Sequence, residues 1–412
     1  MGNRPLEGIR VVEMATFIAA PCTARFLADL GAEVIKVEPP MGDPLRYTAV
    51  NEGRPLDQKE NTSYDLENAG KTCISLNTKS EEGREALEKL LATADVFICN
   101  WRQSPLKRAG LDWETLHEKY PKLVYGYVSG YGEKGPDKDL PGFDFTAFYA
   151  RGGILGPLRD KNSLPMLTVQ GFGDHQVAMN LAAGVLAALF KAKMTGEGDH
   201  VVVSLFHSAV WDISLMLQAS QYGADSTQYP MERWKLGNPL VLCYETADGQ
   251  WLQIAMPQYD RHYPILMNAM GYPELADDAR YYPQKNLIPN REEFSAWITA
   301  EFKKKTCDEW CKLLDANDLP YAIAQEWDSL LEDKQAWASD CFYEMSYSNG
   351  NKRTLVRPPV LFDQMGLPPY ERGPYLGEQT KDILGELGYS AEAIDELIKS
   401  GAAIDMDPAL RD

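Results

Sequence analysis

Short apolar runs alternate with amphipathic stretches along the first half of the chain. Residues 9–13 (IRVVE) are short and rich in β-branched side chains, which is typical of a strand. Residues 20–30 then predict a helix, with Pro21 in its first turn and Gly31 as its stop. Residues 33–38 (EVIKVE) predict the next strand. The first unit is therefore strand, helix, strand.

The same alternation recurs twice. Ser80 and the two acidic residues after it predict a helix start, and residues 95–100 (DVFICN) predict a buried strand. A short helix over residues 113–119 and a strand over residues 123–129 follow. Repeated units of this kind favour a mostly parallel sheet with right-handed crossovers. The predicted fold class is α/β.

A long apolar helix closes this regular part. Residues 179–193 contain many small side chains and predict a helix that packs closely in a core or against another subunit. Residues 200–205 predict one more strand. We therefore place residues 1–215 in one large domain.

The pattern changes beyond residue 225. A turn signal precedes a predicted strand, and three helices follow, so residues 225–330 predict a smaller α+β domain. Residues 335–412 contain a second turn signal at Asn349-Gly350 and two terminal helices. The expected elements are a turn at residues 247–249, a strand at 251–255, and helices near 259–270, 292–302, 307–315, 378–387 and 390–400.

Composition and charge exclude several classes of protein. The 412 residues carry a formal charge of −19, which argues against nucleic acid as a partner. The longest uncharged apolar run near the middle, residues 181–190, has about half the roughly 20 residues of a membrane span. The first eight residues lack the apolar stretch of a secretory signal. We expect a cytoplasmic protein with no membrane segment.

The cysteines and histidines do not suggest a metal site. Seven cysteines are scattered without a C-x-x-C motif, so we interpret them as reduced thiols. Cys307 and Cys311 lie four residues apart on a predicted helix, but no further soft ligand is near them in the sequence. The five histidines form no H-E-x-x-H motif. We predict no bound metal.

Basic residues gather where the predicted strands end. Ligands of parallel α/β sheets bind at the carboxyl ends of the strands. A cationic group there, on an acidic protein, favours an anionic ligand, although each charge taken singly is also typical of a solvated surface. The residues are Arg46, Arg102, Lys107, Arg108 and Lys134.

One segment fits a nucleotide-binding motif, but the residues that follow it do not fit a nucleotide site. Residues 130–135 (GYGEKG) fit G-x-G-x-x-G after a strand, but residues 136–141 (PDKDLP) then prevent the helix that must hold a pyrophosphate. The sequence has no Walker A motif and no G-x-S-x-G nucleophile elbow. A dehydrogenase, a kinase and a serine hydrolase are therefore disfavoured.

The segment Gly171-Phe172-Gly173-Asp174-His175 is the strongest candidate for chemistry. An aspartate before a helix is also an ordinary N-cap, and that interpretation alone explains most such segments. The two glycines, however, would let a substrate carbonyl approach and would leave N–H groups free for an oxyanion. The helix N-terminus would favour ionised Asp174. A carboxylate that attacks a thioester gives a mixed anhydride, which suits acyl transfer.

Several motifs, in order along nearly the whole chain, resemble the class III (formyl-CoA transferase type) CoA-transferase family. They are residues 6–13 (LEGIRVVE), 27–38 (LADLGAEVIKVE), 42–44 (GDP), 76–79 (LNTK), 100–102 (NWR), 129–132 (SGYG), 141–144 (PGFD), 173–174 (GD), 195–198 (TGEG) and 374–380 (PYLGEQT). Residues 42–49, 52–56, 64–69 and 130–142 further resemble the branch that acts in amino-acid fermentation.

This resemblance implies a fold and a reaction. The implied fold is an interlocked homodimer, in which a large Rossmann-like domain is built from both chain ends and a smaller domain lies between them. The implied reaction moves CoA from cinnamoyl-CoA or another arylacryloyl-CoA to an (R)-2-hydroxy acid such as phenyllactate. Isocaprenoyl-CoA with 2-hydroxyisocaproate remains an alternative, and so does racemisation of a 2-methylacyl-CoA. A 2-hydroxyacyl-CoA dehydratase would then act on the product.

The resemblance also assigns residues. Asp174 would be the nucleophile, and CoA esters would be substrates and products with no tightly bound cofactor. Ile18 stands where the formyl-CoA enzymes have glutamine, which favours a larger and less polar acyl group. Pro39 and Pro40 replace a nucleotide-binding arginine, so Arg46 would take that charge. The implied CoA groove contains Phe17, Ile18, Arg46, Leu76, Lys79, Asn100, Trp101, Arg102, Arg108, Phe143 and Asp144.

Overall fold

The computed structural model describes residues 4–223, 229–368 and 370–411, and within them the chain forms two compact units. The first unit comprises the described parts of Met1–Leu155, Leu167–Ser214 and Lys334–Asp412, and the second those of Gly156–Met166 and Leu215–Asp333. The sequence assigned residues 156–166 to the large domain. They belong to the second unit, because backbone bonds join Lys161 and Arg159 to Met231. The predicted start of the small domain, residue 225, lies outside the described residues.

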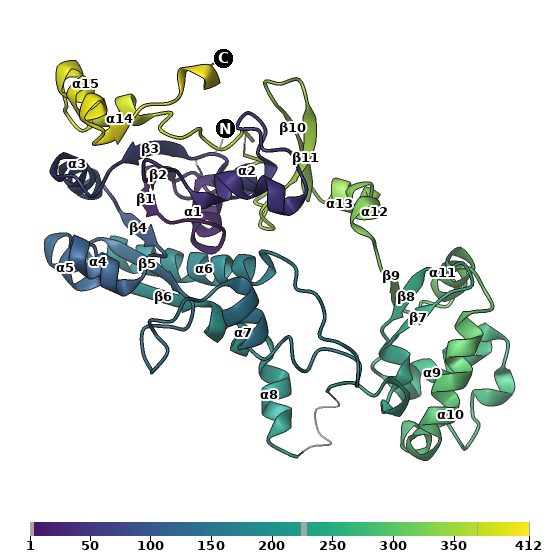
Figure 1. Ribbon diagram of the computed structural model, residues 1–412. Coiled ribbons are helices and arrows are strands. Elements are labelled where there is room, and N and C mark those ends of the chain that lie inside the picture. Colours follow the sequence, from purple (N-terminus) through teal and green to yellow (C-terminus); the bar gives the residue numbers. More distant parts are fainter. Residues whose placement is uncertain (1–3, 224–228, 369, 412) are drawn as a thin grey trace. The chain divides into compact units, whose positions relative to one another are not determined.

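A seven-stranded sheet forms the centre of the first unit (Figure 1). Its order is β12-β3-β2-β1-β4-β5-β6, and the described pairings are parallel except that of β12 with β3. The mostly parallel sheet is therefore confirmed, whereas β3 and β12 were not predicted. The strands are β1 (Arg10–Met14), β2 (Glu33–Glu38), β3 (Thr72–Leu76), β4 (Val96–Cys99), β5 (Val124–Ser129), β6 (His200–Ser204) and β12 (Ala403–Ile404).

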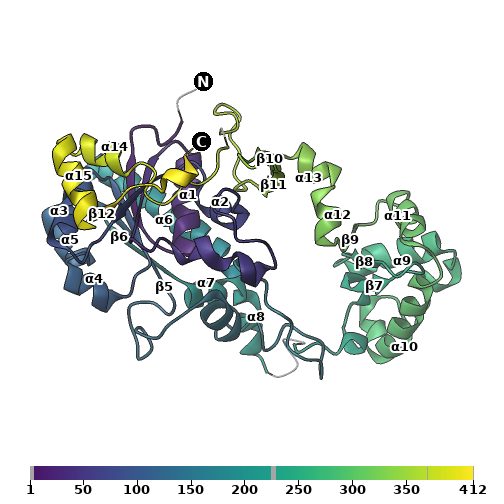
Figure 2. The same cartoon turned by 45° about the horizontal axis from the view of Figure 1, so that its top comes forward.

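Helices cover both faces of this sheet because successive side chains of a strand point to opposite sides. Val11 and Val34 join one core with α1 (Ala19–Asp29) and α6 (Phe172–Thr195). Their neighbours Val12 and Ile35 join the other core. Figures 1 and 2 show α14 and α15 beside α3, so the C-terminal segment completes that layer. Its helices are α3 (Glu81–Leu91), α4 (Gln103–Ala109), α5 (Trp113–Lys119), α14 (Thr380–Glu386) and α15 (Ala391–Ser400).

Helix α6 (Phe172–Thr195) is longer than the residues 179–193 that the sequence predicted. Its length and composition alone would allow it to cross a membrane. In this fold, Val177, Leu181 and Val185 are buried against the sheet and α1. Core helices commonly pass the same test of length and composition, so this helix is weak evidence for a membrane span.

The second unit has its own core. The strands β7 (Cys243–Glu245), β8 (Trp251–Ile254) and β9 (Tyr321–Ile323) form an antiparallel sheet. The helices α9 (Tyr259–Met270), α10 (Gln284–Phe302) and α11 (Cys307–Asp315) pack with it around Trp310, Phe302 and their neighbours. The predicted turn at residues 247–249 joins β7 to β8, and the described part of this unit combines an antiparallel sheet with helices.

The remaining elements are short. The predicted turn at Asn349-Gly350 joins the strands β10 (Phe342–Ser346) and β11 (Lys352–Val356) into a hairpin, and β10 was not predicted. Within the first unit this hairpin contacts α2 (Thr62–Asn68), where the Tyr347 hydroxyl donates to Asp65 Oδ2 at 2.6 Å. The other helices are α2 (Thr62–Asn68), α7 (Leu205–Asp212), α8 (Ser214–Ser220), α12 (Trp327–Leu331) and α13 (Lys334–Ala338).

Candidate active site

The candidate site lies where the strand order of the large sheet reverses. From neighbouring β1 and β4, the order continues to β2 on one side and to β5 on the other. Such a switch point leaves a crevice at the carboxyl ends of the strands. Asn100, after β4, joins the two ends. Its Oδ1 accepts the Thr16 N–H at 3.1 Å, and its Nδ2 donates to the Thr16 carbonyl at 2.8 Å.

A cavity of about 270 Å³ opens at this point. Its wall brings together predicted site residues that lie far apart in the sequence. The turn after β1, the turn after β4, the segment before the short helix Asp144–Ala150 and the start of α6 all contribute. The predicted residues in the wall are Phe17, Ile18, Asn100, Arg102, Phe143, Asp144 and Asp174.

Asp174 lies inside the first turn of α6. The helix begins at Phe172, and the preceding Gly171 is its N-cap with a φ of 79°. The sequence placed Asp174 at the cap, and that placement is wrong, because the Gly171 turn starts the helix earlier. The carboxyl is half-buried and reaches the cavity wall.

Close packing requires a glycine at position 173. A Cβ at this position would meet Phe148 Cγ at 2.3 Å and Asp144 Oδ1 at 2.4 Å. Its N–H donates to Asp144 Oδ1 at 3.1 Å. The expectation that this N–H would be free for an oxyanion is therefore wrong, because the buried Asp144 carboxyl occupies it.

The two carboxyl groups have raised pKa values. Burial raises the pKa of Asp174 to about 7, and the nearby Asp144 and Glu67 add to the rise. Burial likewise raises the pKa of Asp144 to about 6. The helix N-terminus was expected to favour ionised Asp174, but loss of solvent and like charges outweigh it. Asp174 therefore titrates near neutral pH, as general bases and nucleophiles in active sites often do.

The imidazole of His175 forms its hydrogen bond with Glu67 and not with Asp174. Its Nε2 lies 2.9 Å from Glu67 Oε1. Burial alone would lower the pKa of His175, but the hydrogen bond and charge of Glu67 raise it overall. The imidazole is not among the residues that line the cavity. Within this pair, the charge of Glu67 adds to the rise in the pKa of Asp174, whereas the charge of His175 partly opposes it.

In the described part of the chain, one group of side chains has ligand atoms that could hold a metal. The group consists of Cys22, Glu67 and His175. Their ligand atoms lie within 4.8 Å of one another. Burial, and then the charge of Glu67, raise the pKa of Cys22 well above its ordinary value. Metals bind the thiolate form. We therefore interpret the group as an ion pair beside a protonated thiol.

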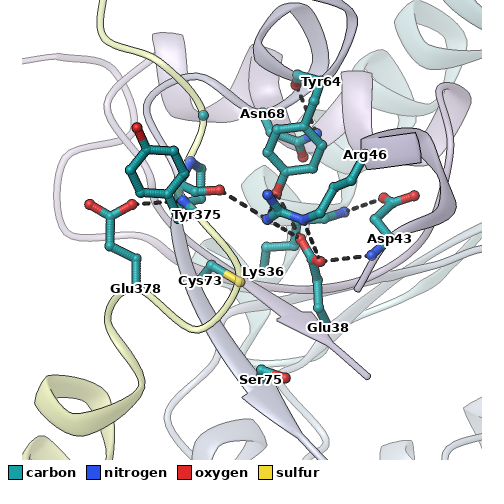
Figure 3. Close-up of polar contacts among 12 residues, drawn as sticks. Lys36, Glu38, Asp43, Arg46, Tyr64, Asn68, Cys73, Ser75, Tyr375 and Glu378 are labelled. Atoms are coloured by element: carbon teal, nitrogen blue, oxygen red, sulfur yellow. Dashed lines mark hydrogen bonds and ion pairs between the residues drawn. The ribbon is translucent and has the colours of Figure 1, made fainter. Parts of the chain in front are cut away.

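Arg46 lies elsewhere, in a polar network that Figure 3 shows. Its guanidinium forms a two-pronged ion pair with Glu38, at 2.9 and 2.8 Å, and also donates to the Pro374 carbonyl at 2.9 Å. It lies against the Tyr64 ring, and it lines a separate cavity of about 250 Å³. Its charge is balanced internally, so the structure gives no support to Arg46 as a phosphate ligand.

The other predicted groove residues lie outside the cavity wall. Leu76 ends β3 and is buried in the core, and Lys79 follows it on the surface. Trp101 packs partly against the same core. Arg108 is exposed on α4, where it donates to Ser104 Oγ at 2.6 Å. The exposed lysine and arginine remain predicted contacts for a ligand that extends out of the cavity.

Sequence reasoning missed part of the wall. Gln103, Tyr127 and Lys138 also line the cavity. Lys138 comes from the glycine- and proline-rich loop after β5. The sequence predicted a basic residue of this loop, Lys134, at the ligand edge, so it identified the loop but not the residue. Tyr127 is inside β5, and its position in the wall depends on the tertiary packing. Only the loop carried a sequence signal.

Fold and cavity together define an α/β enzyme with a carboxylate at the switch point of its sheet. The chain belongs to CoA-transferase family III, whose family model matches residues 6–380. It is therefore a CoA-transferase, and CoA thioesters are the substrates of that family. The family resemblance drawn from the motifs is confirmed.

Two relatives cover nearly the whole chain. Cinnamoyl-CoA:phenyllactate CoA-transferase of Clostridium sporogenes is 52% identical over 394 residues, which are 95% of this chain and 96% of the relative. (R)-2-hydroxy-4-methylpentanoate CoA-transferase of Clostridioides difficile is 41% identical over 390 residues, which are 95% and 97% of the two chains.

A solved structure has the same fold. The crystal structure of a CAIB/BAIF family protein from Brucella suis matches with a TM-score of 0.78 at 28% identity. The match covers 94% of this chain and all of that one, 100%. The mixed α/β architecture with its mostly parallel sheet is therefore shared over 94% of this chain.

Proposed function

We propose that this CoA-transferase moves CoA from cinnamoyl-CoA, or another arylacryloyl-CoA, to (R)-phenyllactate or another aryllactate. The observation that carries the proposal is the half-buried Asp174 carboxyl in the wall of the switch-point cavity. The Clostridium sporogenes relative, at 52% identity, supports this choice of acyl group. Two phenylalanine rings in the same wall, Phe17 and Phe143, offer an apolar surface to an aromatic acyl group.

The reaction begins with ionised Asp174. Its oxygen attacks the thioester carbonyl, the C–S bond breaks, and CoA leaves as the thiolate. The mixed anhydride is then attacked at the aspartyl carbonyl by the thiolate. This releases the enoate and leaves CoA on Asp174 as a thioester. Both enzyme-bound intermediates, the anhydride and the aspartyl thioester, keep an activated acyl group.

The second half reverses these steps with the acceptor. The carboxylate of the hydroxy acid attacks the aspartyl thioester and expels the CoA thiolate, which gives a new anhydride. The thiolate attacks the hydroxyacyl carbonyl, forms 2-hydroxyacyl-CoA and restores the Asp174 carboxylate. Burial of Asp174 limits water, which would otherwise hydrolyse the anhydride.

The proposal includes the setting of the enzyme. We infer that the enzyme is an interlocked homodimer in the cytoplasm. Its product, a 2-hydroxyacyl-CoA, would be the substrate of a 2-hydroxyacyl-CoA dehydratase. Exposed apolar side chains on the first unit, among them Phe190 and Met194 of α6, support a second copy as their cover.

Variants of Asp174 test the nucleophile. Asp174→Ala is expected to lower CoA exchange between cinnamoyl-CoA and (R)-phenyllactate by at least about 1,000-fold, because the carboxylate that forms the proposed anhydride is removed. Asp174→Asn keeps the size and removes the charge, and Asp174→Glu tests reach. Product esters are measured by mass spectrometry. An Asp174→Ala enzyme with full exchange would refute the assignment.

The same assay separates the alternatives. Isocaprenoyl-CoA with 2-hydroxyisocaproate tests the aliphatic acyl group, which the Clostridioides difficile relative favours at 41% identity. Deuterium uptake at Cα of a 2-methylacyl-CoA, without exchange onto an acid, would indicate racemisation. That reaction uses a histidine and aspartate pair, and the cavity wall in the described residues contains no histidine.

A further inference from the structure

The turn between β1 and α1 contains a backbone conformation that its residue disfavours. Phe17 has a φ of 64°, in the left-handed region. A bulky non-glycine residue rarely adopts this conformation, because its Cβ approaches the following carbonyl. Such strain persists only where the surroundings hold it. Phe17 lies in the wall of the Asp174 cavity, so the strain is at the candidate active site.

The conformation decides what the turn offers to the cavity. The Phe17 ring meets the Phe143 ring edge to face, with centroids 6.4 Å apart. The next residue, Ile18, lies against Gly171, where a Cβ would stand 3.3 Å from Ile18 Cδ1. The turn thus touches the segment that begins α6 and carries Asp174.

The carboxylate of Asp43 accepts a hydrogen bond from the backbone of this turn. Asp43 Oδ1 accepts the Phe17 N–H at 3.1 Å and the Leu45 N–H at 2.9 Å. The preceding residue, Thr16, is held separately by Asn100. The side chain of Asp43 is fully buried. The Phe17 N–H therefore has an acceptor that is paired with Lys36 and whose side chain is shielded from solvent, which makes the bond stronger than a neutral one.

Asp43 is itself fixed by buried charges, which Figure 3 shows. Its Oδ2 lies 3.0 Å from Lys36 Nζ, and Lys36 Nζ also donates to the Ala15 carbonyl at 3.0 Å and to Glu13 Oε1 at 2.7 Å. Glu38 Oε2 accepts the Asp43 N–H at 2.7 Å. Both the side chain and the backbone of Asp43 are therefore fixed.

We propose that Asp43, held by Lys36 and Glu38, is a positioning residue for CoA transfer. Its bond to the Phe17 N–H keeps the turn after β1 in the left-handed conformation that presents Phe17 and Ile18 to the Asp174 cavity. The inference rests on the proposed function for its activity readout. It gives the Glu38–Arg46 ion pair a role too, since that pair anchors the acceptor of the Asp43 N–H.

Glycine at position 17 separates this role from a general loss of packing. Glycine adopts a left-handed conformation without strain, whereas alanine lacks the ring but keeps the strain. We compare Asp43→Ala in the wild type, in Phe17→Ala and in Phe17→Gly. The loss of the Lys36 ion pair and of the Leu45 bond is common to all three backgrounds and cancels.

We expect Asp43→Ala to lower kcat/KM for cinnamoyl-CoA and (R)-phenyllactate about 10-fold in the wild type and in Phe17→Ala. In Phe17→Gly the loss should be less than about threefold, because the turn no longer needs the carboxylate. Equal losses in the alanine and glycine backgrounds would overturn the proposal. A purely structural role for Asp43 predicts that equality.

A stability measurement keeps the proposal testable if Asp43→Ala does not fold. With Asp43 in place, Phe17→Gly should unfold at a higher temperature than Phe17→Ala, the reverse of the usual order. A higher midpoint for Phe17→Ala would contradict the proposal. Absence of exchange in the wild type would refute the proposed function alone, since the order of midpoints does not depend on the substrate.

Discussion

At the scale of single residues, the environment of Asp174 disfavours the ionised form of its carboxyl group. The helix N-terminus stabilises a carboxylate, yet burial and the nearby Asp144 and Glu67 raise the pKa of Asp174 to about 7. A nucleophile with a pKa near the working pH is ionised in a substantial fraction of molecules and is more basic than an ordinary carboxylate. Both features suit attack on a thioester.

This pKa predicts the pH dependence of turnover. The attacking form of Asp174 is the deprotonated one, which predominates above a pKa of about 7. We therefore expect kcat/KM to fall about tenfold for each pH unit below this value and to level off above it. Initial rates of CoA exchange between pH 5 and 9 measure the profile. An acid limb near the usual aspartate pKa would contradict this account of the site.

Asp144→Asn supplies the matched control. The amide oxygen can still accept the Gly173 N–H, but the charge that raises the pKa of Asp174 is gone. The acid limb of the profile should move to lower pH while the protein stays folded. An unchanged limb would show that the two carboxyl groups do not interact.

At the scale of elements, the start of α6 depends on close packing at Gly173. A methyl group there would meet Phe148 and Asp144 well inside contact distance. We expect Gly173→Ala to reduce the free energy of unfolding by about 1–3 kcal/mol, as overpacking does, and to displace Asp174. Urea unfolding and the exchange assay measure the two effects.

Gly385 in α14 is the control for that substitution. A Cβ there meets nothing within 4 Å. Since alanine is the better helix former, Gly385→Ala should be neutral or stabilise the protein by up to about 1 kcal/mol. A similar loss in both variants would mean that glycine itself, and not the contact with Phe148, is the cause.

At the scale of the whole molecule, exposed apolar side chains predict association. Phe190, Met194 and Trp211 are each at least 70% exposed on the first unit of the chain. An interlocked dimer would cover such surface. Sedimentation should give twice the chain mass of 46.2 kDa at micromolar concentration. A monomer that catalyses exchange at the full rate would contradict this part of the proposal.

The sequence predicted the regular elements well where their patterns are local. The strand at residues 33–38 and the helix at 113–119 have the predicted bounds, because apolar spacing and caps are properties of neighbouring residues. It missed β3 (Thr72–Leu76), a short TCISL run in which the polar Thr72 and Ser75 interrupt the apolar pattern. It also missed β12, a two-residue strand that exists only by pairing with β3.

The candidate site shows the same division. Strand ends, glycines and the family motifs pointed to Phe17, Asn100 and Asp174, and parallel strands bring such strand ends together. The partner of each charge was not predictable. Arg46 binds Glu38, Asp144 takes the Gly173 N–H, and Glu67 pairs with His175, since such contacts depend on distances across the fold.

The sequence by itself determined the α/β class and the family, and it pointed to Asp174 as the proposed nucleophile, because local pattern and motif order carry that information. The tertiary structure decided the electrostatic state of the site. Burial set the pKa of Asp174, and a buried carboxylate held Phe17 in a conformation that its own chemistry disfavours. Desolvation and charge pairing act between residues far apart in the chain, so only the folded arrangement could fix them.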